Sequence, residues 1–246
     1  RTEAYDAESG GRYTLDNGLL TTMVPKRMWR AVRLIQSRQL ADSLTFHADF
    51  EQEVAATEAY GGRYPLGGTL PEPVDGGKTG KGASLDAPLV FAARHHVSPE
   101  SGMISFAVRI PDSSRGNSVL LKLGGPTSLE LRVVNGKLAL TGAVLSAPPS
   151  TAIVADRSWH TVSLTWQGQN VEVTSDGSAV ITAALKQPLE LPGMGHGQEI
   201  RDESRHVQPA EITFGPVQGA VIDDLRMGRR STFRLPSVEG VTATRF

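Results

Sequence analysis

Carboxylate pairs are the first chemistry to look for in this chain, because no cysteine is present to act as a nucleophile or a thiolate ligand. Retaining glycosidases hold two carboxyl groups about 5 to 5.5 Å apart, and one strand face can supply them as E-x-D-x-E or E-x-D-x-x-E. The sequence contains neither pattern, and the nearest string is Glu199-Ile200-Arg201-Asp202-Glu203. A lyase would need a tyrosine beside a histidine, and the four tyrosines all lie at or before Tyr64. The sequence therefore predicts a protein that is not an enzyme.

A long polar loop over residues 188–210 carries the other side chains with ligand chemistry, and loops of this length are often functional. Side chains of metal-ligand type occur in it at irregular spacing: His196, Glu199, Asp202 and His206. Histidines in loops are usually solvated, so a solvated loop is the main interpretation and a transition-metal site the alternative. For an organic ligand, the candidate contacts are Trp159, His196, Arg201 and His206.

Residues 158–185 are expected to position Trp159, because three strand-like runs and two turns follow one another there. Val162, Leu164 and Trp166 alternate with polar residues, and so do Val171 and Val173, which is the period of a half-buried strand. Gly168 and the Asp176-Gly177 pair suit tight hairpin turns. His160 shares the face of Val162, so we expect a core histidine. Trp159 faces the other way, as a sugar-stacking platform or as a plug between sheet and loop.

Short strands with turn residues between them continue outside this meander. Alternating runs begin near residue 103, and Asn135-Gly136 is the strongest hairpin signal in the chain. This pattern predicts an all-β antiparallel sandwich. The formal net charge of −1 gives no reason to expect nucleic-acid binding. The sequence contains no run of about 18 apolar residues, so we expect no membrane-spanning segment.

The glycine-rich stretch Gly76-Gly77-Lys78-Thr79-Gly80-Lys81 invites comparison with a phosphate-binding loop. The spacing G-x-x-x-x-G-K-[ST] is not met and no helical pattern follows, so a nucleotide site is not favoured.

The flanks differ from the centre. Residues 1–25 indicate an extended arm, and residues 26–41 hold five basic and no acidic residues with apolar ones at helical spacing. We expect a short N-terminal helix that covers one end of the sheet; the alternative is a basic amphipathic helix that docks a partner or an anionic surface. The first residue is Arg1, so we expect a processed, exported chain without its signal peptide. Residues 229–246 form a basic, irregular tail.

Several segments of the chain resemble, in order, those of laminin G-like domains with the concanavalin A-like jelly roll. They are LTFHADFE at 44–51, GKTGKGASLD at 77–86, SFAVRI at 105–110, SWHTVSLTW at 158–166, Asp176-Gly177 and VIDDLRM at 221–227. The resemblance implies a jelly-roll domain over residues 44–228, with residues 1–43 and 229–246 outside it. It also implies a structural calcium ion where the first and last strands meet, with Asp49, Glu51 and Asp223 as ligands; the alternative is that these acids are paired or cap a turn.

The resemblance implies a binding protein, because the family uses this fold mainly for carbohydrate binding, adhesion and protein contacts. We therefore expect a non-catalytic module of an exported protein that recognises a glycan or a protein surface. The alternative is an accessory subunit docked into a larger assembly through its arm, helix and tail. A glycoside hydrolase or polysaccharide lyase is the third possibility.

Overall fold

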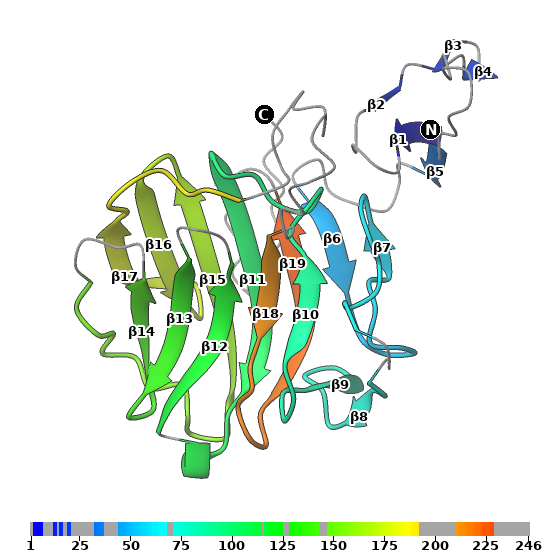
Figure 1. The fold of residues 1–246 in the computed structure, drawn as a ribbon. Helices are drawn as coiled ribbons and strands as arrows, with labels where there is room; N and C mark the ends of the chain where they lie inside the picture. The colour runs from blue at the N-terminus through cyan, green and yellow to red at the C-terminus, as the bar shows by residue number, and fades with distance from the viewer. Residues whose placement is uncertain are drawn as a thin grey trace.

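The computed structural model describes two packed antiparallel sheets (Figure 1). It describes residues 44–67, 71–114, 116–124, 128–142, 147–191 and 210–228, together with the backbone of short strands before residue 37. Within these residues no helix has the length and apolar character needed to cross a membrane.

The first sheet has five strands and faces the viewer in Figure 1. In spatial order they are β10 (Leu89–Ala92), β18 (Glu211–Phe214), β12 (Asn117–Leu123), β13 (Leu129–Val134) and β14 (Lys137–Gly142). A single turn of 3₁₀ helix, Asp112–Ser114, precedes β12.

The second sheet lies behind the first and has nine strands. Seven run in the order β17 (Ser178–Ala184), β16 (Asn170–Ser175), β15 (Trp159–Gln167), β11 (Ser101–Arg109), β19 (Val221–Gly228), β6 (Leu44–Ala48) and β7 (Glu58–Ala59). The other two branch from β19, which pairs with β9 (Lys81–Ser84), and β9 pairs with β8 (Val74–Asp75). The predicted all-β antiparallel sandwich is therefore confirmed.

The predicted meander is the strands β15, β16 and β17. Val162, Leu164, Trp166, Val171 and Val173 are all buried. The two glycine-containing hairpins form as expected, since Asp176 and Gly177 have φ of 51° and 78°, and Asn135 and Gly136 have 51° and 80°. Positive φ at both central residues is the requirement of a two-residue hairpin whose twist matches its strands.

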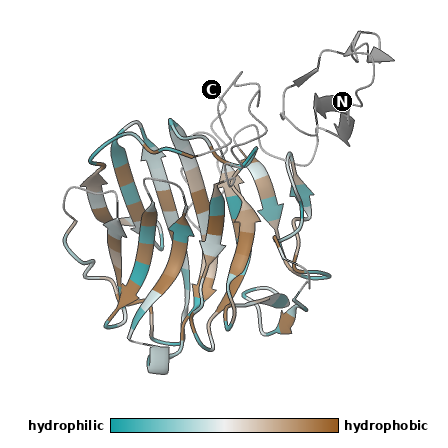
Figure 2. Cartoon of the chain, in the orientation of Figure 1, coloured by the Kyte–Doolittle hydropathy of each residue, from teal (hydrophilic) through white to brown (hydrophobic). Residues whose placement is uncertain are grey.

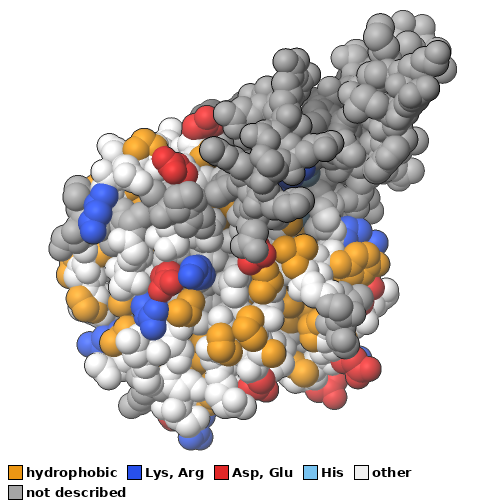
Figure 3. Space-filling model, viewed as in Figure 1, with side chains coloured by type: hydrophobic (Ala, Val, Ile, Leu, Met, Phe, Trp, Pro, Cys, Tyr) orange, Lys and Arg blue, Asp and Glu red, His pale blue; other side chains and the backbone are white. Residues whose placement is uncertain are grey.

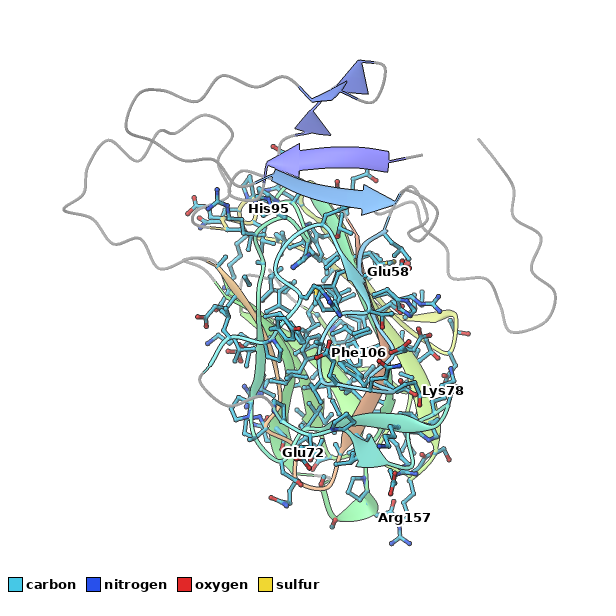
Figure 4. All side chains as sticks on the ribbon, turned by 90° about the vertical axis from the view of Figure 1, so that its right-hand side faces the viewer. Glu58, Glu72, Lys78, His95, Phe106 and Arg157 are labelled. Atoms are coloured by element: carbon cyan, nitrogen blue, oxygen red, sulfur yellow. The ribbon has the colours of Figure 1, made fainter. Side chains whose placement is uncertain are left out.

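The core lies between the sheets and follows the alternation of the strands, which Figure 2 shows as bands of apolar residues. Four phenylalanines tie the two sheets together through edge-to-face contacts: Phe46 with Phe91, Phe91 with Phe214, and Phe214 with Phe106. Figure 4 shows Phe106 in the middle of this layer. The sandwich thus needs no covalent cross-link.

The predicted N-terminal helix is wrong where the structure describes it. Val32–Gln36, inside the predicted range 26–41, form strand β5, which pairs with β1 (Thr2–Asp6) and leaves the other side of β1 to β2 (Arg12–Tyr13). A second small pair joins β3 (Leu15–Asp16) to β4 (Leu19–Leu20). The backbone groups of residues 32–36 find their partners on β1, and such tertiary pairing overrides a weak helical propensity. The rest of 26–41 and the tail 229–246 lie outside the described residues.

Candidate functional site

The glycine-rich loop of residues 76–80 joins β8 to β9 and lies on the outer side of the nine-stranded sheet. The loop is closed by a hydrogen bond from the Gly77 N–H to the Gly80 carbonyl at 2.9 Å. A Cβ at Gly77 would come within 2.1 Å of the Lys81 carbonyl oxygen, so only glycine fits there. The glycines therefore fold the loop tightly onto the sheet.

Two carboxylates from distant segments hold this loop in place. Asp223 of β19 is almost fully buried, and its Oδ2 accepts a hydrogen bond from the Thr79 N–H at 3.0 Å. Its Oδ1 accepts from the Asp224 N–H at 2.6 Å. Burial raises the pKa of Asp223, and these backbone N–H groups, with that of Lys78, act in the opposite direction. Glu51 accepts from the Lys81 N–H at 3.3 Å, so the loop is held at Thr79 and at its junction with β9.

The same contacts bear on calcium, which the resemblance implied at Asp49, Glu51 and Asp223. Calcium takes six to eight oxygen ligands, whereas N–H donors occupy the Asp223 carboxylate, and Asp49 Oδ1 accepts from the Glu51 N–H at 3.3 Å. Among the described residues no group of three or more His, Asp or Glu side chains could hold a metal ion. This donor set does not fit calcium, and the calcium prediction rests on the resemblance alone.

Beside the loop lies a surface that we call the rim, made of Lys78, Arg109, Trp159 and Thr161. Arg109 and Trp159 are cross-strand neighbours on β11 and β15, and the guanidinium carbon lies 5.3 Å from the centre of the indole ring. Lys78 extends from the loop and donates to the Thr161 hydroxyl at 3.2 Å. Figure 4 shows Lys78 on the outer side of the sandwich.

Trp159 is half-buried and, as predicted, lies on the face opposite to Val162. The Arg109 guanidinium lies over its ring, which is a cation–π contact. Gly76 borders this pair, because a Cβ there would lie 3.3 Å from an Arg109 guanidinium nitrogen. The rim therefore presents two cationic groups and a hydroxyl around an aromatic side chain, and the loop that carries Lys78 is held from beneath by Asp223.

His160, expected in the core, instead bridges two carboxylates and is only partly buried. Its Nδ1 lies 2.7 Å from Asp176 Oδ2, and its Nε2 lies 3.0 Å from Asp156 Oδ1. Both ring nitrogens can donate only in the protonated imidazolium. Burial alone would lower the pKa of His160, but the hydrogen bonds with Asp176 and Asp156 outweigh it and raise the pKa. The hydrogen bond from His160 in turn lowers the pKa of Asp156.

A second polar cluster, which the sequence analysis missed, lies where β19 meets β6. One oxygen of Asp224 is 3.0 Å from His47 Nε2 and accepts from Arg226 Nε at 2.9 Å. Burial of Asp224 acts to raise its pKa, but these two partners lower it overall. On the neighbouring β7, burial raises the pKa of Glu58. Only the register of β6 against β19 brings these residues together.

The remaining candidates from the sequence, His196, Arg201 and His206, lie outside the described residues, as do Glu199, Asp202 and Glu203. The structure therefore unites Trp159, Glu51 and Asp223 around one loop, and the part of the site predicted in the 188–210 loop stays a prediction.

Residues 112–206 match the family model of the laminin G domain, which confirms the resemblance over that part of the chain. Domain 4 of AbnA, a GH43 extracellular arabinanase from Geobacillus stearothermophilus, has a similar structure, with a TM-score of 0.54, 15% identity and coverage of 78% of this chain and 95% of that one. At this identity the likeness shows the fold alone.

Two larger proteins contain a region of similar shape. The botulinum neurotoxin serotype D binding domain has a TM-score of 0.49 at 11% identity, with 78% of this chain and 49% of that chain covered. Trypanosoma rangeli sialidase has a TM-score of 0.48 at 15% identity, with 79% of this chain and 32% of that chain covered. This chain thus spans about a third of the length of the sialidase. No curated protein sequence matches it.

Proposed function

We propose that this chain is a non-catalytic glycan-binding module of an exported protein, and that the rim is its sugar-binding surface. The observation that carries the proposal is the stacked pair of Arg109 and Trp159 beside the Lys78 ammonium and the Thr161 hydroxyl. Sugars offer hydroxyl oxygens to N–H donors and apolar C–H faces to an aromatic ring. Lys78 and Arg109 supply the donors, and the half-buried Trp159 ring, one face of which Arg109 covers, supplies the apolar surface.

Fixed geometry supports the same proposal. The hydrogen bonds from the loop backbone to Asp223 and Glu51 hold the loop that carries Lys78, and the cation–π contact holds Arg109. A surface ordered before binding loses less conformational entropy when a ligand arrives. We propose no catalytic role, because the sequence contains neither E-x-D-x-E nor E-x-D-x-x-E.

Glycan-array binding of the full chain, followed by calorimetry with any glycan that binds, tests the proposal. The arabinanase domain was solved with arabinotriose, so short arabinans belong among the first probes. Arg109→Ala and Trp159→Ala should each weaken binding at least about tenfold, which is the scale of losing a central contact.

Arg63→Ala is the matched control, because Arg63 also lies over an aromatic ring, that of Tyr64 at 5.7 Å, but elsewhere on the sandwich. It should leave the affinity unchanged. An equal loss of glycan affinity in all three variants, or unchanged affinity in Arg109→Ala and Trp159→Ala, would show that the rim is not the sugar-binding surface.

The accessory-subunit alternative draws on one observation. Strands β2, β1 and β5 form a sheet of their own, and in the described part of the chain no strand of the sandwich pairs with them. Docking through residues 26–41 remains a prediction. A pull-down that depends on residues 1–43 and is indifferent to Arg109→Ala would favour this alternative over glycan binding.

A further inference from the structure

The edges of the two sheets are not protected equally. An edge strand exposes unpaired N–H and C=O groups, and proteins usually keep such strands short, charged or covered. Strand β7 has two residues, one of them Glu58. Strand β10 accepts a hydrogen bond on the Val90 carbonyl from the Leu66 N–H. The branch of the nine-stranded sheet ends at β8, which also has two residues. With β14 included, the edges other than β17 are thus short or covered.

Strand β14 is covered by the segment that follows it. The Ser150 N–H donates to the Leu138 carbonyl at 2.8 Å, and Ile153 forms a bridge with Lys137. Figure 1 shows β17, the remaining edge, on the same side of the sandwich as β14. No segment among the described residues covers β17 in this way.

Strand β17 is also long and uncharged. It runs for seven residues with the sequence SAVITAA. The Leu185 N–H donates to the Gln169 carbonyl at 2.8 Å, which fixes the phase of its ladder with β16. In an antiparallel ladder every second residue points its backbone groups at the neighbour. Ile181 and Ala183 therefore bond to β16, while Thr182 and Ala184 point their N–H and C=O groups outward.

We propose that β17 pairs antiparallel with β17 of a second copy of this chain, so that the two nine-stranded sheets become continuous. A two-fold axis at Ala183 places Thr182 against Ala184 of the partner subunit, and Ala184 against the partner's Thr182. All the outward groups of these residues are then satisfied by one self-complementary contact, which is what a two-fold interface requires.

The charge pattern favours a second copy as the occupant. Strand β17 carries no charged residue, so two copies meet without like-charge repulsion. The first charged residue beyond the strand is Lys186, which this register places opposite Val180 of the partner subunit. Val180 is a partly buried apolar residue packed against the core, and this contact shields it further from water.

Sedimentation velocity of the full chain over a wide concentration range tests the pairing. The expected result is a reversible dimer of twice the 26.3 kDa chain mass. Thr182→Lys should weaken the dimer at least about tenfold, because lysine on an edge strand opposes strand addition. The monomer should tolerate this change, because residue 182 lies beside Glu172 in the register and a cross-strand ion pair can form.

Thr165→Lys is the control, since Thr165 flanks the same Glu172 from the other side, on interior strand β15. It should leave the dimer intact. Hydrogen exchange adds a readout specific to the register: the Thr182 and Ala184 amides should be protected only where the dimer is populated, and those of Ile181 and Ala183 always. A chain that stays monomeric at every concentration, or a dimer indifferent to Thr182→Lys, overturns the proposal.

Discussion

Replacing His160 with glutamine should destabilise the fold most at mildly acidic pH. The imidazolium donates to Asp176 and Asp156 at 2.7 and 3.0 Å. The histidine side chain is 13% exposed, but the two carboxylates are 55% and 39% exposed. A hydrogen bond to a charged group contributes about 1.5–3 kcal/mol when buried, and an exposed ion pair about 0.2–1 kcal/mol. For this half-exposed pair we expect about 1 kcal/mol each and about 2 kcal/mol together.

The pH dependence identifies the cause. The pKa of His160 is raised in the folded chain, so its stabilisation is fully present below the unfolded value of about 6.5. It is lost as the pH rises through the raised folded value. Asp156 sets the acidic limit. Its pKa is lowered in the folded chain, so the stabilisation from that carboxylate is fully present above its ordinary pKa of about 3.9. It is lost as the pH falls through the lowered folded value.

The assay is the melting temperature of wild type and His160→Gln across this pH range. At about pH 6 the variant should melt about 4–8 °C lower, at about 2–4 °C per kcal/mol for a domain of this size. The difference should shrink as the pH rises. His47→Gln is the control, because His47 is hydrogen-bonded to one carboxylate, Asp224, where His160 is hydrogen-bonded to two, and it should cost less at pH 6. A difference that stays constant with pH would refute the reasoning, because the lost contacts would then not depend on the proton.

Three other outcomes are expected. Trp166→Ala should cost about 3–5 kcal/mol in urea unfolding, because Trp166 is buried and donates to the Ser98 carbonyl at 2.9 Å; a loss under about 1 kcal/mol would contradict its core position. Asp223→Asn should cost about 1–3 kcal/mol and EDTA should leave the melting temperature of wild type unchanged. A fall in melting temperature on EDTA addition would restore the calcium prediction. No glycoside should be hydrolysed, and turnover that disappears in Glu199→Gln or Glu203→Gln would show a catalytic pair in that loop.

The strands and turns of the sandwich could be predicted because their signals are local. Alternation marks which face of β15 is buried, and Asn135-Gly136 and Asp176-Gly177 mark turns that need positive φ. The segment of residues 26–41 shows the limit of such signals. Its apolar spacing fits a helix, but pairing with β1 determines the structure of Val32–Gln36, and no property of the segment itself reveals that partner.

The contacts of the site depend on register and long-range packing. Sequence patterns identified Trp159 but not Arg109, because the two meet only through the pairing of β11 with β15. The partners of His160 were more predictable from the sequence. Asp156 lies four residues before His160, and the predicted Asp-Gly hairpin places Asp176 beside Thr161. The acids Glu51 and Asp223 were picked out from the sequence, but only the structure shows that each accepts a hydrogen bond from an N–H group of the glycine-rich loop or its junction with β9.

Calorimetry of glycan binding by wild type, Arg109→Ala and Arg63→Ala tests the central claim most directly. Both variants remove a guanidinium that lies over an aromatic ring, at 5.3 Å in one case and 5.7 Å in the other. We predict that Arg109→Ala weakens binding at least about tenfold and that Arg63→Ala binds like wild type. Wild-type affinity in Arg109→Ala, with the fold intact, would contradict the claim that the rim is the glycan-binding surface.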